Sequence, residues 1–196
     1  MKMKNLTRKV DDKTILDKFV EDFVKVIEKY CKYIIVSGFV AIAHGRSRGT
    51  EDIDMIIEKI SKEKFIDIHN SLTNSGFECM QSDDEGKIYD DYLAKGDSIR
   101  YTKKGFNFAP PEMEIKLAKD ELDNYQISTR QKLPFTKLDI YFSSIEMNIA
   151  FKEEYLKSDK DLEDARHLRI IYSNKIDEKE IKRIKEQINR LRMKKQ

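Results

Sequence analysis

Two aspartates, Asp52 and Asp54, have a spacing that could bring two carboxylates to one metal ion. They begin the run Asp-Ile-Asp-Met-Ile-Ile at 52–57, whose apolar and β-branched residues predict a strand. Side chains alternate along a strand, so both carboxylates would leave the same face, with Cα atoms about 6.6 Å apart at ~3.3 Å per residue. Such a pair could hold one divalent cation or flank two, although alternating acids also occur on solvated strand faces.

The turn before this strand has the residues of a phosphate site. A β-branched run at 33–36 predicts a buried strand that ends at Ser37 and Gly38, and residues 39–44 follow as a short helix. Free N–H groups at a helix start attract phosphate, and Gly38 would let the backbone approach without a Cβ. The loop before Asp52 adds candidate phosphate contacts, which are Arg46, Arg48 and Thr50. The sequence therefore predicts a phosphate cradle and a carboxylate pair at the ends of two strands, although the loop residues would also suit a solvated turn.

Periodicity along the chain indicates which elements hold these groups. Helices are predicted at 11–30, 39–44, from the cap Ser61 to 74–76, at 83–95, 143–157 and 158–172, and from 177 onward. Strands are predicted at 33–36, 52–57, 77–80, 99–101, 113–117 and 138–142, with 119–135 irregular or weakly helical. Ser143 with Glu146, and Asp177 with Glu180, have the spacing of capping boxes.

This order of elements predicts an α+β (α/β) fold. A mixed nucleotide-site sheet flanked by helices, with the N-terminal helix packed on it, would occupy 1–142. A C-terminal helical part packed on that sheet domain would occupy 143–196, because strands stop near 143 and helices take over.

Length and composition exclude several classes of protein. The 196 residues are 38% charged and 39% hydrophobic, and 10 Phe and 9 Tyr are too many for a disordered chain. A net charge of +2 excludes a polycation held on nucleic acid by overall charge. No apolar run approaches the ~20 residues that span a bilayer, and the basic start lacks an apolar segment, so we expect no membrane partner and no signal peptide. Cys31 and Cys79 suit buried thiols in a reducing cytoplasm, which is the predicted location.

The stretch 37–54 resembles the signature of the polymerase-beta-like nucleotidyltransferase superfamily. In that signature a pair of small residues opens a helix, and a hydrophobic–Asp–hydrophobic–Asp strand follows. The spacing here is most similar to the minimal bacterial and archaeal branch that includes abortive-infection (AbiEii-type) toxin nucleotidyltransferases. Lys152 and the segment 160–165 are similar to that branch's helical Lys and Lys-Asp-x-x-Asp motifs. The order Ser37-Gly38 departs from the family's more frequent Gly-Gly or Gly-Ser.

The resemblance implies a reaction and the residues that perform it. Asp52 and Asp54, with a third carboxylate on an adjacent strand, would be catalytic and would bind two Mg²⁺ ions, with Mn²⁺ as an alternative. Glu114 is preferred as the third carboxylate, and Asp139 is the alternative. Lys152 would contact the nucleotide or would be a surface lysine. The reaction would move an NMP group from an NTP to an RNA, protein or small-molecule acceptor and release pyrophosphate, in a toxin–antitoxin or defence setting.

Two other functions fit the same residues. A Glu at the third position and the irregular stretch 119–135 would suit a catalytically inactive nucleotide- or RNA-binding module. An antitoxin-like interaction protein could also use this fold. The basic helix predicted at 179–196 would either contact RNA or present a solvated face.

Overall fold

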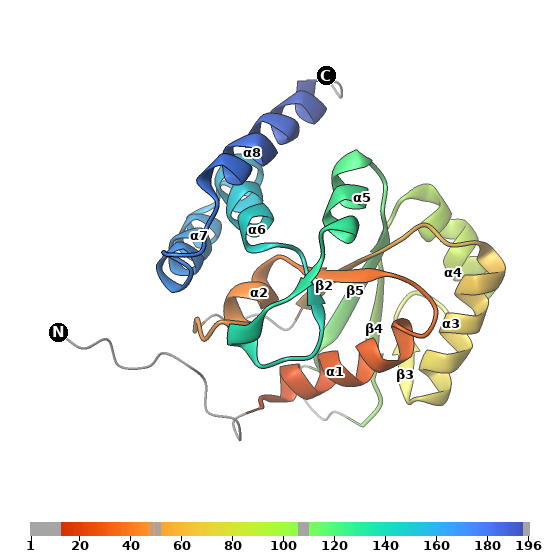
Figure 1. Cartoon of the computed structure of the whole chain (residues 1–196). Coiled ribbons are helices and arrows are strands. Elements are labelled where there is room, and N and C mark those ends of the chain that lie inside the picture. The colour runs from red at the N-terminus through yellow and green to blue at the C-terminus, as the bar shows by residue number, and fades with distance from the viewer. Residues whose placement is uncertain (1–12, 48, 50–51, 106–109, 194–196) are drawn as a thin grey trace.

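A seven-stranded mixed sheet forms the centre of the molecule (Figure 1). The computed structural model describes residues 13–47, 49, 52–105 and 110–193. In sheet order, the strands are β3 (Phe77–Cys79), β4 (Ile99–Lys103), β5 (Glu112–Leu117), β2 (Asp52–Ile57), β1 (Tyr33–Val36), β7 (Tyr141–Phe142) and β6 (Gln131–Lys132). Because β2 runs parallel to β5 and antiparallel to β1, the strand that carries Asp52 and Asp54 is a central one.

Helices precede, connect and follow the strands. The α-helices are α1 (Ile15–Ile27), α2 (Gly38–Ala43), α3 (Lys62–Asn74), α4 (Glu85–Asp91), α5 (Glu121–Ser128), α6 (Ile145–Phe151), α7 (Asp159–Ile171) and α8 (Glu178–Met193). Shorter elements are the 3₁₀ turns η1 (Leu93–Lys95) and η2 (Pro134–Thr136) and the π-helical segment η3 (Lys152–Leu156). The last three α-helices group together at one end of the molecule in Figure 1. Buried Ile181, Ile184 and Ile188 form the apolar stripe of α8.

The main core extends from α1 and α3, which pack against each other and the sheet, to the C-terminal helices α6, α7 and α8. Thr14 and Asp17 form a capping box that starts α1. Phe19 and Phe23 of that helix meet the ring of Phe77 edge-on, with centroids 5.7 and 4.9 Å apart. Because aromatic rings bury large apolar areas, these contacts stabilise the β3 edge of the sheet.

A second, smaller apolar cluster lies on the sheet beneath α5. Ile34 of β1 pairs with Ile56 of β2, and both pack against Ala118 and Ile127. Asp54 lies one row further along the same face, because residues two apart on a strand share a face. The α5 cluster therefore ends where the charged part of this face begins.

The predicted element types are confirmed over most of the described chain, with four differences. The strand expected at 138–142 is limited to Tyr141–Phe142. The following helix is capped by Ser144, whose hydroxyl accepts from the Met147 N–H, because the Ser143 hydroxyl instead donates to Gln126. That helix is α-helical only to Phe151, after which η3 is π-helical.

The fourth difference concerns the stretch expected to be irregular or weakly helical, 119–135. It contains the regular helix α5, whose cap Asp120 accepts hydrogen bonds from the N–H groups of Leu122 and Asp123. The boundary between 142 and 143 as a domain division stays a prediction. Cys31 and Cys79 are buried free thiols, as predicted. Within the described residues, no helix is both long and apolar enough to span a bilayer.

Candidate active site

Four carboxylates share one face of the parallel pair β2–β5. Asp52 pairs in register with Glu112, and Asp54 pairs in register with Glu114. Partners in register on adjacent strands lie on the same face, so the two rows of acids are neighbours. The structure therefore brings together the three acids proposed from the sequence. Glu112 was missed, although its Glu-Met-Glu alternation repeats the pattern of β2.

Asp54 is the acid with the most perturbed surroundings in this group. Burial raises the pKa of its carboxyl group, and the nearby charges of Glu114 and Asp52 raise it further. The nearby Ser37 hydroxyl and the charge of Lys116 favour the ionised form of this carboxyl group, so both partly oppose the rise in pKa. A carboxylate held in this way gains free energy when a cation approaches.

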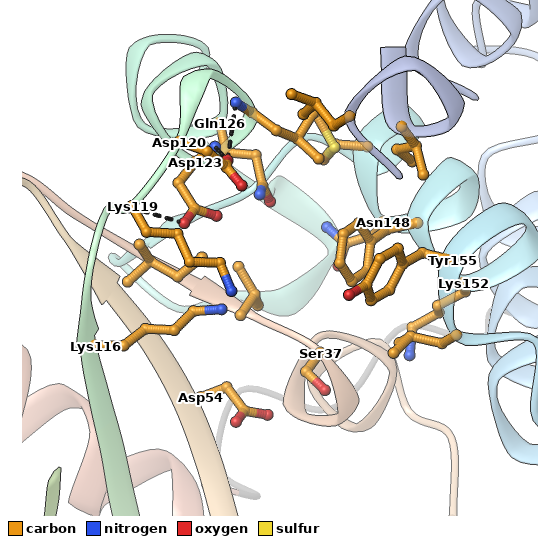
Figure 2. A pocket seen from close by; sticks show the side chains of 18 of the residues that line it. Ser37, Asp54, Lys116, Lys119, Asp120, Asp123, Gln126, Asn148, Lys152 and Tyr155 are labelled. Carbon is orange, nitrogen blue, oxygen red and sulfur yellow. Dashed lines mark hydrogen bonds between the residues drawn. The ribbon is translucent and has the colours of Figure 1, made fainter. Parts of the chain in front are cut away.

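Ser37 has an unusual backbone conformation at the turn between β1 and α2. Its φ of 65° and ψ of −136° lie in a region populated almost only by glycine, which costs about 1–3 kcal/mol for another residue. Its neighbour Gly38 is the buried first residue of α2 and has no positive φ. The strain therefore falls on the serine, whose side chain lies near Asp54 (Figure 2).

Glu114 is engaged by an arginine from the next strand. Nε and Nη2 of Arg100 on β4 donate to its Oε2 at 3.0 and 2.9 Å, and Nη1 lies 3.7 Å from Oε2 of Glu112. The other candidate, Asp139, is exposed and pairs with Lys132 at 2.5 Å. Asp139 precedes β7, and β1 separates β7 from β2 in the sheet. Of the two candidates, Glu114 is therefore the one that lies beside Asp54.

The residues suit Mg²⁺ by donor chemistry. Carboxylate oxygens are the ligands that Mg²⁺ prefers, and the pKa of Asp54 is raised first by burial and then by the charges of Glu114 and Asp52. Over the part of the chain that the structure describes, no group of three or more His, Cys, Asp or Glu side chains is already arranged around one ion position. Glu114 is paired instead with the guanidinium of Arg100.

A cavity of about 480 Å³ opens beside Asp54 (Figure 2). One wall belongs to the sheet and α5, and the other belongs to α6, η3 and α8. The polar residues that line it are Ser37, Asp54, Glu114, Lys116, Lys119, Asp120, Asp123, Gln126, Asn148, Lys152, Tyr155 and Arg192. The acids and the Ser37 turn thus lie at one end of a space large enough for a small organic ligand.

An aromatic surface lines the helical wall. The rings of Phe151 and Tyr155 are stacked with centroids 4.7 Å apart, and the Arg192 guanidinium lies 5.4 Å from the Tyr155 ring centre. Tyr155 is 46% exposed, so part of its ring remains accessible to a planar ligand beside Phe151 and Arg192. Sequence reasoning missed this surface, although the i, i+4 spacing of the two rings on a helix was a usable signal.

The buried amide of Asn148 faces the same space from α6. Its Nδ2 donates to the carbonyl oxygens of Ser143 and Ser144, at 3.0 and 2.9 Å. Across the cavity, Gln126 of α5 accepts the Ser143 hydroxyl through Oε1. These hydrogen bonds fix both side chains between the α5 wall and the helical wall.

Lys152 and Arg46 are both engaged with acids of α7. The buried Lys152 ammonium lies 2.8 Å from Asp164 and 3.3 Å from Asp161. Arg46 pairs with Glu163 at 2.5 Å and also with Asp164. The motif residues noted in the sequence therefore do come together, but they join η3, α7 and the loop after α2.

Two further candidate phosphate ligands, Arg48 and Thr50, lie outside the described residues.

His44, expected to be a helix-end residue, is the buried C-terminal cap of α2. Its Nε2 is 2.8 Å from the Tyr172 hydroxyl.

The fold is an α+β nucleotidyltransferase-like fold, with a mixed sheet, flanking helices and C-terminal helices. A solved structure that it resembles is the solution structure of the antibiotic-resistance factor ANT(2'')-Ia, with a TM-score of 0.56 and 12% sequence identity. The match covers 90% of this chain and 92% of that one. No protein-family model matches the chain, and no curated protein matches its sequence. At this identity the likeness is one of fold, and the narrower likeness to the abortive-infection branch stays a prediction.

Proposed function

We propose that this protein is a Mg²⁺-dependent nucleotidyltransferase that moves an NMP group from an NTP to an acceptor hydroxyl. The observation that carries the proposal is the in-register placement of Asp54 beside Glu114, next to the Ser37 turn and at one end of the cavity. The nucleotidyltransferase-like fold supports the same reaction class.

The transfer balances as a single displacement at phosphorus. The acceptor oxygen forms a bond to the α-phosphorus, the bond from that phosphorus to the bridging oxygen breaks, and pyrophosphate leaves. The hydroxyl proton passes to Glu114, which becomes available as a base when it leaves Arg100. Bound Mg²⁺, or Mn²⁺ in its place, would stabilise the charge on the entering and leaving oxygens, held by Asp52, Asp54 and Glu114.

The remaining site residues bind or position the nucleotide. Ser37 and Gly38 would hold phosphate oxygens at the turn, and Tyr155 offers a ring face for the base. Lys152 and Arg46 act through Asp164, which fixes the helical wall against the loop after α2. Arg48 and Thr50 remain proposed phosphate contacts.

Transfer of label tests this proposal directly. The protein is incubated with each of the four NTPs labelled at the α-phosphate, with Mg²⁺, and with RNA, protein or small-metabolite fractions. We expect label on an acceptor, lost in Asp54→Asn and retained in Asp139→Asn, whose residue is exposed and distant. Absence of label on every fraction, or equal label with Asp54→Asn, would refute the proposal.

The Arg100–Glu114 pair favours a second candidate, a nucleotide-binding module without transfer. A module of this kind would bind an NTP, as measured by calorimetry, but would give no labelled acceptor with any of the three fractions. Mg²⁺-dependent label transfer would exclude it.

The biological setting is proposed from the motif resemblance alone. A toxin-like nucleotidyltransferase would arrest growth when expressed in a bacterial host, and Asp54→Asn would restore growth at equal protein level. Equal growth of cells that express either form would exclude a toxic activity in that host.

A further inference from the structure

We infer that the acceptor carries a phosphate group, bound by Lys116 and Lys119. The inference rests on the proposed function and names the chemical class of its second substrate. It starts from two amino groups of the cavity that have no partner among the described residues. In Figure 2 both extend into the cavity from the β5 side.

The other two cations of the cavity are already engaged. Lys152 is buried between Asp161 and Asp164. Arg192 lies over the Tyr155 ring, and its Nη1 donates to a main-chain carbonyl of η3. Among the described residues of the cavity wall, Lys116 and Lys119 are therefore the cations that can meet a negative charge without giving up an existing ion pair, hydrogen bond or ring contact.

The acids on the same wall do not neutralise these lysines by direct contact. Asp120 accepts two main-chain N–H groups at the start of α5, and Asp123 accepts the main-chain N–H of Lys119. Both lysines lie close enough to favour the charged form of Asp123, and Lys116 does the same for Asp54. Neither amino group forms an ion pair with any acid in the described part of the chain.

The position of the lysines assigns them to the acceptor rather than to the nucleotide. Lys116 follows Glu114 by two residues on β5, so the two share a face of the sheet. The Ser37 turn and Tyr155, proposed to hold the nucleotide, lie apart from the lysine wall in Figure 2. The space beside Glu114, the proposed base, is where the attacking hydroxyl must approach.

Charge then selects the acceptor. Ammonium groups bind phosphate oxygens as point charges, and two of them three residues apart match the two negative charges of a phosphomonoester. An acceptor rich in amino groups would meet these lysines with like charge. A phosphorylated metabolite and a nucleic-acid end share the required chemistry.

The test uses the full chain saturated with Mg²⁺ and an α,β-methylene NTP, which fills the nucleotide site without transfer. Inorganic phosphate, ribose 5-phosphate, ribose, glucosamine and a short oligoribonucleotide are then titrated, and main-chain amide shifts at 116–119 are followed by NMR. We expect saturable binding of phosphate and ribose 5-phosphate, with ribose and glucosamine weaker by about tenfold or more.

Variants separate the acceptor site from the nucleotide site. The double variant Lys116→Met/Lys119→Met is expected to weaken phosphate binding by about tenfold, while the Kd for the NTP analogue changes by less than about twofold. Lys182→Met, on the exposed side of α8, is the matched control and leaves both unchanged. Tighter and more salt-dependent binding of the oligoribonucleotide than of ribose 5-phosphate identifies a nucleic-acid acceptor, and equal binding identifies a small one.

Three results would overturn the inference. Equal phosphate binding by the wild type and the double variant would show that the two lysines do not form the phosphate site. A loss of NTP-analogue affinity in the double variant assigns the lysines to the triphosphate instead. Equal binding of ribose and ribose 5-phosphate would show that the site does not select acceptors by their phosphate charge. Failure of the proposed function is distinct, because the NTP analogue then fails to bind in the presence of Mg²⁺.

Discussion

The Asp54 carboxylate is placed where its charge is unfavourable until a cation arrives. Its folded-state pKa lies above the ordinary value of 3.8, first because of burial. A carboxyl group with a raised pKa gives stability below its unfolded pKa, and that stability is lost as the pH rises through the folded value. At neutral pH the ionised side chain therefore destabilises the fold.

Replacing this charge should stabilise the metal-free protein. We expect Asp54→Asn to raise Tm in EDTA at pH 7 by about 2–4 °C, roughly 1 kcal/mol for a chain of this size. The asparagine oxygen can still accept the Ser37 hydroxyl. The gain in Tm should vanish below pH 4. At pH 7, Mg²⁺ should raise the Tm of the wild type more than that of the variant. An equal Mg²⁺ effect in both proteins would contradict the metal assignment, and Asp139→Asn serves as the control.

Arg100 competes with a cation for Glu114, so its removal should favour metal binding. We expect Arg100→Met to lower the Mg²⁺ concentration at half-maximal Tm shift by severalfold, because the site loses a positive charge 2.9 Å from a ligand oxygen. Lys132→Met, which frees the distant Asp139, should leave the titration unchanged. A weaker Mg²⁺ response in Arg100→Met would show that the arginine supports the site instead.

For single residues, the sequence predicted which acids belong to the candidate site but did not predict which residues they pair with. The alternation at 52–54 and the motif resemblance were sufficient to select three acids. Nothing local indicates that Glu112 faces Asp52 or that Arg100 reaches Glu114, because register between strands distant in the chain depends on the whole sheet. Lys116 was passed over for the same reason.

Among the elements, the turn at Ser37 stores the strain. We expect Ser37→Gly to be more stable than Ser37→Ala by about 1–3 kcal/mol, because only glycine populates this conformation freely while both variants lose the hydroxyl. Urea unfolding of the matched pair measures the difference. Equal stabilities would show that the backbone there relaxes without cost.

The buried ion network between η3 and α7 holds the helical wall of the cavity. Lys152→Met removes the buried cation that Asp161 and Asp164 share and leaves Asp164 with Arg46 alone, so we expect a loss of about 3–5 kcal/mol in the free energy of unfolding. Lys157→Met, which removes only the exposed pair with Glu154, should cost less than about 1 kcal/mol. Similar losses in both variants would mean that the buried network contributes little.

Element types were predictable where periodicity was strong, and boundaries were not. Two adjacent serines at 143 and 144 could each start α6, and the choice is made by Gln126, which takes the Ser143 hydroxyl. Helix α5 was underestimated because its apolar stripe is short, although Asp120 is an ordinary cap. The π-helical η3 has no sequence signal that we can identify.

At the scale of the whole molecule, His44 and Tyr172 tie the sheet region to the C-terminal helices. Burial lowers the pKa of His44 to about 4, while its two ring nitrogens face the Val40 carbonyl oxygen and the Tyr172 hydroxyl. For a base with a depressed pKa, the stability is present above the unfolded value of 6.5 and is lost as the pH falls toward 4.

Acid should therefore loosen this tie. Between pH 7 and pH 4.5 we expect the wild type to lose about 2 kcal/mol more unfolding free energy than His44→Gln, which has no group that titrates there. Denaturant unfolding at a series of pH values measures the difference. Parallel pH profiles for the two proteins would contradict this role.

The fold class followed from the order of elements, since strands alternating with helices and then helices alone permit few arrangements. The order of strands in the sheet did not follow. β5 lies between β4 and β2 and runs parallel to the latter, although β2 and β5 are separated in the chain by α3, β3, α4 and β4.

The position of β5 between two strands that precede it in the chain has a kinetic consequence. A refolding chain must close a loop of roughly sixty residues before β5 can dock between its neighbours, and such long-range closure is slow. The same docking step crowds the acids of β5 against those of β2. Mutual repulsion therefore opposes this slow step of folding, and divalent cations or added salt would speed it by screening those charges.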